Sequence, residues 1–179
     1  MKKPLYFVLL LAFFAFSFSS QAQADENTQA LSNSEFTDLL KRSFKSNKNG
    51  QLLLSVSDVF VATVNADNVS FAAIINLDKL AEVSPEARQN IERFDSFLFF
   101  LDREQLTLTI IGEPVVRNGL FGLRDNFSIK LGPIPVSNAT LRQLGLEVEK
   151  ANITNLKLDG ITLESIHLEQ GAIHLLERK

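Results

Sequence analysis

Two histidines near the end of the chain are the residues whose types and spacing come closest to a chemical site. His167 and His174 flank Gln170-Gly171, which we interpret as a two-residue turn, so the two imidazoles should face each other across a hairpin. Glu169 should lie on the same face. Two imidazoles and a carboxylate can bind a divalent metal ion. The opposite face of these strands is apolar, however, so an ordinary solvent-exposed surface explains the three residues, and we predict neither a metal nor another cofactor.

The other residue patterns that support catalysis are missing from the sequence. There is no cysteine, which excludes a thiol nucleophile, a thiolate metal site and a disulfide. No serine lies in a G-x-S-x-G motif, and there is no glycine-rich phosphate loop. The carboxylates are scattered, and none is placed by its neighbours in an apolar pocket. We therefore predict that the protein is not an enzyme.

A group of phenylalanines is the strongest candidate for a binding site. Apart from Tyr6, phenylalanine supplies all the aromatic side chains, so aromatic bulk comes without a polar group. Several of these rings lie in an expected helix and expected strands that are apolar on more than one side. This is more apolar surface than one core-facing side requires, and the excess could line a cavity for an apolar ligand. An ordinary hydrophobic core is the alternative. The candidate lining residues are Phe60, Phe71, Phe94, Phe97, Phe99 and Phe100.

The first 24 residues have the pattern of a secretory signal peptide. Lys2 and Lys3 precede the apolar run Leu5–Phe18, and Ala22-Gln23-Ala24 forms an A-x-A cleavage site. The run is too short for a typical membrane span, and a retained anchor is the main alternative. Cleavage predicts a periplasmic or secreted bacterial protein with no membrane span and no lipidated cysteine.

The charge balance argues against nucleic acid as a partner. The formal net charge is −3, and loss of the two lysines of the leader makes it −5. The sequence has no basic cluster that would bind phosphates. The partner classes that remain are a lipid or other amphiphile and a protein of the cell envelope.

A long hairpin folded at Asn118-Gly119 organises the middle of the chain, because Asn-Gly is the strongest signal for a type I′ turn. The expected cross-strand partners are Val116 with Phe121, Pro114 with Leu123, Gly112 with Asp125, Ile110 with Phe127, Leu108 with Ile129 and Leu106 with Leu131. This face is apolar and the other face is polar, which indicates the buried side. The two prolines of Leu131–Val136 should then end the strand.

A leader, a helix and a second hairpin come first after the signal peptide. Asp25–Ser34 is polar, and we expect it to be loose, with Ser34 capping a helix over Glu35–Phe44. A loop at Asn65–Asn68 should join the strands Leu52–Val64 and Val69–Leu77. Both faces of this strand pair are largely apolar, so we expect the pair to be covered on both sides.

The main helix should begin at Ser84-Pro85-Glu86, where serine is a suitable cap and proline suits the first turn. Ala87 and Ile91 begin an apolar stripe that reaches the phenylalanine group. Residues Phe97–Leu101 fit either the end of this helix or the start of a strand, and periodicity does not separate the two.

The last part of the chain reads as a short helix followed by a meander of strands. Ser137 should cap a helix over Asn138–Leu144. Asp159-Gly160 should fold a hairpin that places Leu156 opposite Leu163. The apolar alternation then changes phase, which predicts a β-bulge near Glu164-Ser165.

This order of elements resembles small bacterial envelope proteins of the tubular lipid-binding (TULIP-like) type, the kind that includes YceB and YpmS. The resemblance covers nearly all of Leu31–Lys179 and rests on Gly112–Pro114, Asn118-Gly119, Leu131–Val136 and Leu141–Leu144. It implies a highly curved antiparallel sheet around a long helix, with an apolar cavity for a lipid or other amphiphile. The chain departs from the lipoprotein members because it lacks their anchor cysteine, so a free periplasmic protein is expected.

Together these observations predict one α+β domain over residues 35–179, a half-barrel in which a curved antiparallel sheet wraps one main helix. The expected function is binding or carrying a lipid-like ligand without catalysis. The alternative is a structural or adaptor protein of the envelope that acts through protein contacts. Nothing in the residues identifies the ligand, the partner or the oligomeric state.

Overall fold

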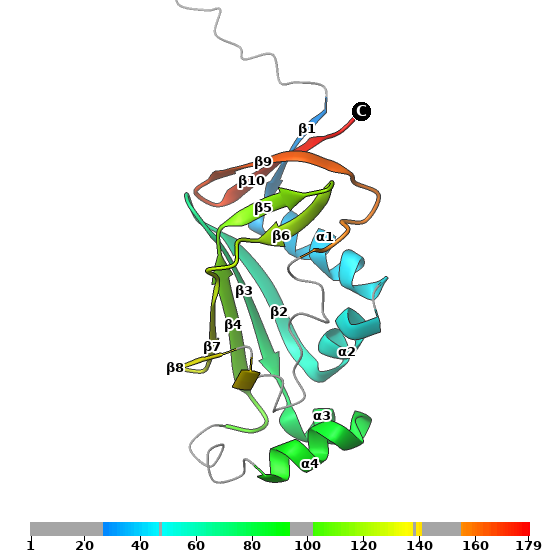
Figure 1. Ribbon diagram of the computed structural model, residues 1–179, viewed down its shortest axis with the longest axis vertical. Helices are drawn as coiled ribbons and strands as arrows, with labels where there is room; N and C mark the ends of the chain where they lie inside the picture. The colour runs from blue at the N-terminus through cyan, green and yellow to red at the C-terminus, as the bar shows by residue number, and fades with distance from the viewer. Residues whose placement is uncertain (1–26, 47, 94–101, 138, 141–154) are drawn as a thin grey trace, which may run out of the picture.

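Three antiparallel sheets and four helices make up the described part of the chain, an α+β domain (Figure 1). The computed structural model describes residues 27–46, 48–93, 102–137, 139–140 and 155–179. None of the described helices is long and apolar enough to cross a membrane.

The largest sheet has five strands in the order β2-β3-β4-β7-β8. Its strands are β2 Ser57–Val64, β3 Val69–Ile75, β4 Leu106–Gly112, β7 Ser128–Leu131 and β8 Ile134–Val136. A second sheet has the order β1-β10-β9, and a two-stranded sheet pairs β5 with β6. These strands are β1 Thr28–Ser32, β9 Leu163–Glu169, β10 Ala172–Glu177, β5 Pro114–Arg117 and β6 Leu120–Leu123.

The four helices lie in two groups. The helix bounds are α1 Asn33–Lys45, α2 Lys48–Val56, α3 Leu77–Val83 and α4 Pro85–Arg93. Helices α1 and α2 lie beside β2, whereas α3 and α4 lie beyond the lower ends of the long strands (Figure 1). The described helices that pack on the sheet are therefore α1 and α2. The helix expected after Ser84 does begin there, as α4, and the Ala87 N–H donates to the Ser84 hydroxyl at 3.2 Å. Its described part does not pack on the sheet, where we expected the main helix.

The leader is more ordered than expected, because Thr28–Ser32 forms β1 and pairs with β10. The cap of α1 is Ser32, not Ser34. The Ser32 hydroxyl lies 3.5 Å from the Glu35 N–H that donates to it, and the Ser32 N–H donates to the Glu35 carboxylate at 2.9 Å. This reciprocal pair is a capping box, which requires a glutamate three residues after the serine, and Ser34 has no such partner.

The strand pairing at the tip of the central hairpin is as predicted, but the pairing at its base is different. Val116 pairs with Phe121 and Pro114 with Leu123, and both Asn118 and Gly119 have positive φ. Further down, the predicted partners of Ile110 and Leu108 are wrong by two residues, because Ile110 pairs with Ile129 and Leu108 with Leu131. Leu131 is therefore the partner of Leu108 and not of Leu106, and the partner of Leu106 is Ile75 on the other neighbouring strand, β3.

An unequal interruption of the two strands causes this shift. Only Glu113 separates β4 from β5, whereas residues 124–127 separate β6 from β7. The Arg124 N–H donates to the Glu113 carbonyl at 2.9 Å, and the Phe127 N–H donates to the Arg124 carbonyl at 3.2 Å, so residues 124–127 form a turn. Gly112 and Asp125 are therefore not partners. A shift of two residues leaves every side chain on its original face, so apolar alternation cannot detect it.

The second hairpin has the predicted loop and register, with Val64 opposite Val69 and Ala62 opposite Phe71. Two other expectations for it are wrong. The expected start of its first strand, residues 52–56, lies in α2. In addition, Val59 and Val61 are 44% and 43% exposed, so one face of this strand is not covered.

The proline segment after β7 turns the chain instead of ending the sheet. Leu131 pairs with Ile134 across a tight turn in which Gly132 has φ 55°, and β8 becomes the last strand. Pro135 pairs with Lys130 on this edge strand, where a missing N–H breaks no ladder. The Ser137 hydroxyl accepts from the Thr140 N–H at 3.1 Å, as a cap would; residues 141–144 of the expected helix lie outside the described residues.

The C-terminal hairpin and its bulge are confirmed. Leu168 pairs with Ile173, as predicted. Nearer the start of β9, Ser165 pairs with Leu176 and Leu163 pairs with the next residue, Glu177. Glu164 is therefore the extra residue of a β-bulge. The turn at Asp159-Gly160 forms, with φ 75° at the glycine. The expected pairing of Leu156 with Leu163 is wrong, because Leu156 exchanges backbone hydrogen bonds with Phe121 of β6.

Candidate functional site: the apolar inner face of the five-stranded sheet

One face of the five-stranded sheet, which we call the inner face, carries apolar side chains on all five strands. These are Phe60, Ala62, Val64, Val69, Phe71, Ala73, Ile75, Leu106, Leu108, Ile110, Ile129, Leu131, Ile134 and Val136. All are buried except the two on β8, which are half-buried. Because side chains alternate between faces with a period of two, the register places this whole set on one side.

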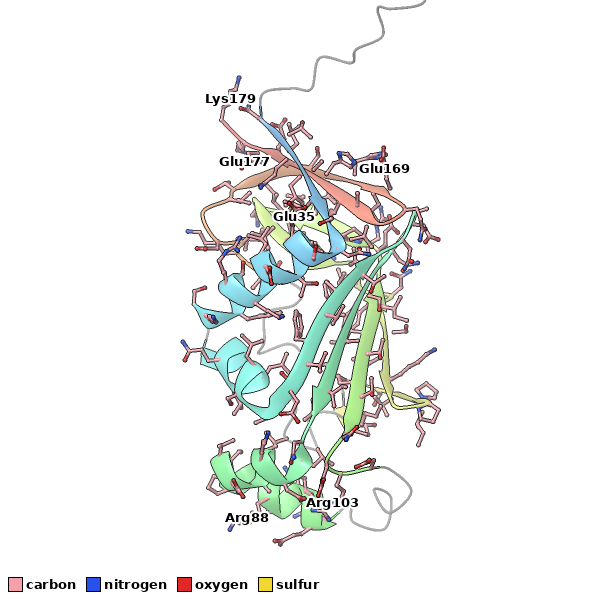
Figure 2. The ribbon with its side chains drawn as sticks, turned by 180° about the vertical axis from the view of Figure 1, so that it is seen from behind. Glu35, Arg88, Arg103, Glu169, Glu177 and Lys179 are labelled. Carbon is pink, nitrogen blue, oxygen red and sulfur yellow. The ribbon has the colours of Figure 1, made fainter. Side chains whose placement is uncertain are left out.

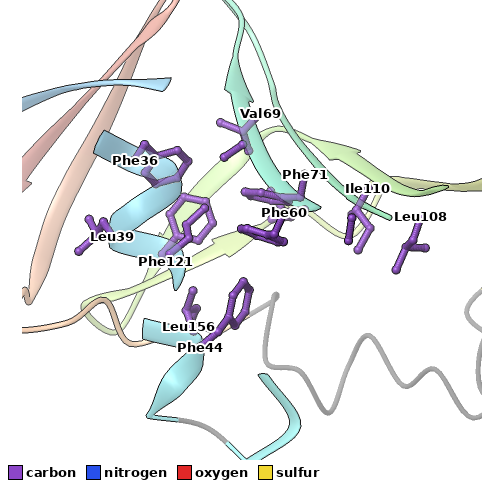
Figure 3. Close-up of a cluster of buried hydrophobic side chains, with 14 of the residues drawn as sticks. Phe36, Leu39, Phe44, Phe60, Val69, Phe71, Leu108, Ile110, Phe121 and Leu156 are labelled. Atoms are coloured by element: carbon purple, nitrogen blue, oxygen red, sulfur yellow. The ribbon is translucent and has the colours of Figure 1, made fainter. Parts of the chain in front are cut away.

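Three phenylalanine rings pack together where α1 crosses the inner face (Figure 3). The Phe36 ring of α1 lies 5.7 Å from the Phe121 ring of β6 and 6.5 Å from the Phe71 ring of β3, measured between centroids. The Phe71 and Phe121 rings are 6.2 Å apart and nearly perpendicular. These are the separations and tilts that packed aromatic pairs prefer, so the described rings fill this end of the inner face.

A second aromatic pair continues the cluster along β2. The Phe44 and Phe60 rings meet edge to face, with centroids 5.5 Å apart. Two of the predicted site residues, Phe60 and Phe71, thus share the inner face, and each contacts a ring of α1. The other four, Phe94, Phe97, Phe99 and Phe100, lie outside the described residues, as does the choice between helix and strand for residues 97–101.

Three aromatic partners of these residues were not among the predicted site residues: Phe36, Phe44 and Phe121. Their sequence signals were present, since the first two lie on the apolar stripe of α1 and the third pairs with Val116 at the hairpin tip. Sequence periodicity shows that each ring faces a core. It does not show that a helix, a long strand and a separate hairpin direct their rings to the same place.

Polar side chains of α1 form hydrogen bonds with the backbone of β2 beside this cluster. The Thr37 hydroxyl accepts from the Ala62 N–H at 2.9 Å, and the Asn33 side-chain oxygen accepts from the Val64 N–H at 2.8 Å. On the helix's other side, the buried Ser43 hydroxyl accepts from the Asp159 N–H at 3.0 Å. These bonds fix the position of α1, which in turn places the aromatic rings over β2 and β3.

The inner face extends well beyond the aromatic cluster. The main contacts between the described helices and the sheet are those of α1 and α2 with β2. Leu108 and Ile110 on β4 lie to the far side of Phe71 from α1 (Figure 3), and they continue into Ile129 and Leu131 on β7. This second part of the inner face is aliphatic and buried.

The predicted histidine group forms on the three-stranded sheet β1-β10-β9. His167 and His174 are cross-strand partners, and their ring centroids are 6.0 Å apart. His174 Nε2 lies 3.4 Å from a Glu169 carboxylate oxygen, without the alignment of a hydrogen bond. Among the residues that the structure describes, no three side chains of this kind are close enough to hold a metal ion.

Ion pairs of the described region lie on its exposed surface and not on the inner face. Lys79 pairs with Asp58 at 2.7 Å, and Arg103 pairs with Asp78 at 3.1 Å, both near α3. Arg88 and Arg103 lie at this end of the molecule, whereas Glu169 and Glu177 lie at the opposite end (Figure 2). Exposed pairs of this kind contribute little to stability, so the inner face is organised by apolar packing and not by charge.

Comparisons with known proteins add no assignment. No family model matches the chain, and neither the curated proteins nor the solved structures that were compared show a significant similarity to it. The fold and the inner face therefore define the protein no further than an α+β domain built on an apolar sheet face.

Proposed function

We propose that the protein binds the apolar chain of a lipid or similar amphiphile against the inner face, in the periplasm or outside the cell, and that it performs no catalysis. One observation supports this most directly: the inner face is apolar across five consecutive strands, and Ser57, opposite Ile75 at the start of β2, is the one polar side chain that the described strands place on it. Such a face offers a bound acyl chain about 0.8 kcal/mol for each buried methylene group.

We place the ligand on the aliphatic part of the inner face, because the main contacts of the described helices are with β2 and not with β4 or β7. The side chains of this part are buried, so binding would require them to become accessible. Phe60 and Phe71 already pack against rings of α1, so they would form the closed end of the site and not its lining. Leu108, Ile110 and Leu131 would form the wall along which the chain lies. A half-barrel that curves around the ligand, as the tubular lipid-binding resemblance implies, belongs to this proposal; the described sheets are open in their strand order.

Mass spectrometry under native conditions tests the proposal directly. The protein is purified without detergent from cells that express the full-length chain, and is then mixed with a palmitate series and with phosphatidylglycerol vesicles. A bound mass that extracts into organic solvent supports the proposal. A mass that corresponds to protein alone, before and after these additions, contradicts it.

A pair of variants on one strand locates the site. Ala73 faces inward opposite Leu108, whereas Ala72 faces outward opposite Thr109. Ala73→Leu should narrow the inner face and lower palmitate affinity by about tenfold, and Ala72→Leu should leave it unchanged. Thermal melts of both variants show whether they are folded. Equal affinities in two folded variants would place the ligand elsewhere.

A second function, a structural or adaptor role, has one observation in its favour. Val59 and Val61 expose an apolar strip on the outer face of β2, although most large apolar side chains of the described region are buried. If this strip binds an envelope protein, Val61→Ser should remove that protein from the purified material while leaving lipid binding intact. Co-purification of lipid alone would favour the first proposal.

A further inference from the structure

The outer edge of β1 has backbone groups that point away from its sheet. The Glu177 N–H donates to the Asn27 carbonyl at 3.1 Å, which makes these two residues a hydrogen-bonded pair. In an antiparallel ladder such pairs alternate with pairs whose N–H and C=O groups point outward. Counting along the register, Gln29 and Leu31 bond to β10, whereas Thr28, Ala30 and Ser32 direct their backbone groups to the outer edge.

Within the described part of the chain, two of these three outward residues have an N–H with no acceptor. The Ser32 N–H donates to the Glu35 carboxylate within the capping box. For Thr28 and Ala30, the described residues supply no hydrogen-bond partner to the outward N–H and C=O groups, and both residues are exposed. The edge therefore offers two donors and two acceptors at alternate residues.

Two other sheet edges, those of β2 and β8, are protected by identifiable devices. On β2, the outward N–H groups of Ala62 and Val64 donate to side chains of α1, and the Val64 carbonyl accepts from the Gly171 N–H at 3.0 Å. On β8, the one residue whose N–H would point outward is Pro135, which has none. Exposed edges without such devices pair readily with another strand.

We propose that β1 pairs antiparallel with β1 of a second copy of this chain, with Thr28 of each copy opposite Ala30 of the other. This register uses all outward groups of both residues, and it gives four backbone hydrogen bonds across a two-fold axis. It joins the two three-stranded sheets into one six-stranded sheet. It also leaves the Ser32 capping box intact, whereas a register centred on Ala30 would compete with it.

Side chains at the two-fold axis fit a second copy better than an arbitrary strand. Gln29 would face Gln29 of the second copy, and a carboxamide can donate to and accept from its own equivalent. The residues of β1 carry no charge, so two copies meet without like-charge repulsion. Thr28 and Ala30 are small and leave room on the outer surface. A five-residue edge buries well under about 1,000 Å², so we expect a weak, concentration-dependent dimer.

A single-cysteine experiment tests this register, and the chain is suited to it because the protein has no cysteine of its own. In the proposed dimer the two Gln29 residues form a non-hydrogen-bonded pair with Cα atoms about 4.5 Å apart, within disulfide range. Gln29→Cys should therefore form a disulfide-linked dimer at least about tenfold faster than Thr28→Cys, because Thr28 does not meet its own equivalent. A link through Ala30→Cys with none through Gln29→Cys would overturn the register.

Sedimentation of the cysteine-free protein provides the second measurement. The native chain should show a monomer–dimer equilibrium that shifts toward dimer as concentration rises. Ala30→Pro should abolish it, because proline removes an outward N–H that no bond inside the fold uses; its thermal melt shows that the domain remains folded. A native chain that stays monomeric at all concentrations, or a dimer that persists in Ala30→Pro, contradicts the proposal.

Discussion

The hydroxyl of Thr37 on α1 accepts a hydrogen bond of 2.9 Å from the backbone N–H of Ala62, which lies 25 residues later on the edge strand β2. The same hydroxyl is 3.3 Å from the Ala62 carbonyl oxygen and 2.7 Å from the Asn33 carbonyl oxygen. Both residues are buried, so this contact replaces the strand that would otherwise pair with β2. Together with Asn33, which accepts from the Val64 N–H, this side chain closes the edge of β2 and holds the helix that carries Phe36.

Replacing this hydroxyl should destabilise the domain. Thr37→Val keeps the shape of the side chain but leaves the buried Ala62 N–H without an acceptor, a loss of about 1–3 kcal/mol. Urea unfolding measures the change. Thr63→Val is the matched control, since Thr63 is exposed on the outer face of the same strand. Equal unfolding midpoints for the two variants would show that the Thr37 contact is not stabilising.

The aromatic cluster should dominate the stability of the upper core. Phe121 is 1% exposed and packs against two other rings, so Phe121→Ala should cost about 3–5 kcal/mol. Val61→Ala, on the exposed side of β2, should change stability by less than about 0.5 kcal/mol. Thermal denaturation followed by circular dichroism compares the two. A small effect at Phe121 would mean that the three rings are not packed together in solution.

The register of the central hairpin predicts different outcomes for two neighbouring apolar residues. Ile129 is buried opposite Ile110, so Ile129→Asp places an unpaired carboxylate in the core and should unfold the domain. Phe127 lies in the turn and is half-buried, so Phe127→Asp should give a folded, weakened domain. The apolar pattern alone had placed Phe127 opposite Ile110. Cooperative melting of Ile129→Asp, with loss of folding in Phe127→Asp, would restore that register.

Acid should weaken the start of α1 through Glu35. A hydrogen bond from the Ser32 hydroxyl, and after it one from the Ser32 backbone N–H, holds the pKa of the Glu35 carboxyl below its ordinary value. A lowered pKa in the folded state means that the carboxylate stabilises the fold above the unfolded-state pKa, and that this contribution is lost as pH falls through the folded-state pKa.

The matched variant for this prediction is Glu35→Gln, which keeps the capping geometry but does not titrate. The difference in melting temperature between the native protein and Glu35→Gln should be greatest near neutral pH and should shrink in acid. A difference that stays constant down through the acid range would show that the carboxylate does not stabilise the helix in its charged form.

Local signals predicted most elements of the fold. Asn118-Gly119 fixed the hairpin tip because those two residues tolerate the positive φ that the turn requires. The change of apolar phase near Glu164 predicted the bulge, since a strand can change its buried face only by inserting a residue. Residues 52–56 were misassigned because a short apolar run fits a strand and a buried helix equally well.

Only part of the candidate site could be predicted from the sequence. The sequence placed Phe60 and Phe71 in a strand pair that is apolar on both faces. The structure shows that both rings lie on the covered face. That Phe36, Phe44 and Phe121 would be their partners depended on how α1 and the β5–β6 hairpin lie over the sheet. The exposure of Val59 and Val61 is likewise a tertiary result, because an apolar side chain has the same local signal whether or not another element covers it.

The sequence by itself determined the turns at Asn118-Gly119 and Asp159-Gly160, the apolar face of the central hairpin and where α4 begins, because these depend on backbone preferences and on periods of a few residues. Tertiary structure alone decided the base of the central hairpin, where a two-residue shift preserves every face. It also decided which edges are closed. Thr37 and Asn33 protect β2 and Pro135 protects β8, whereas Thr28 and Ala30 of β1 keep outward backbone groups. These differences depend on which elements lie beside each strand, which a local sequence pattern does not show.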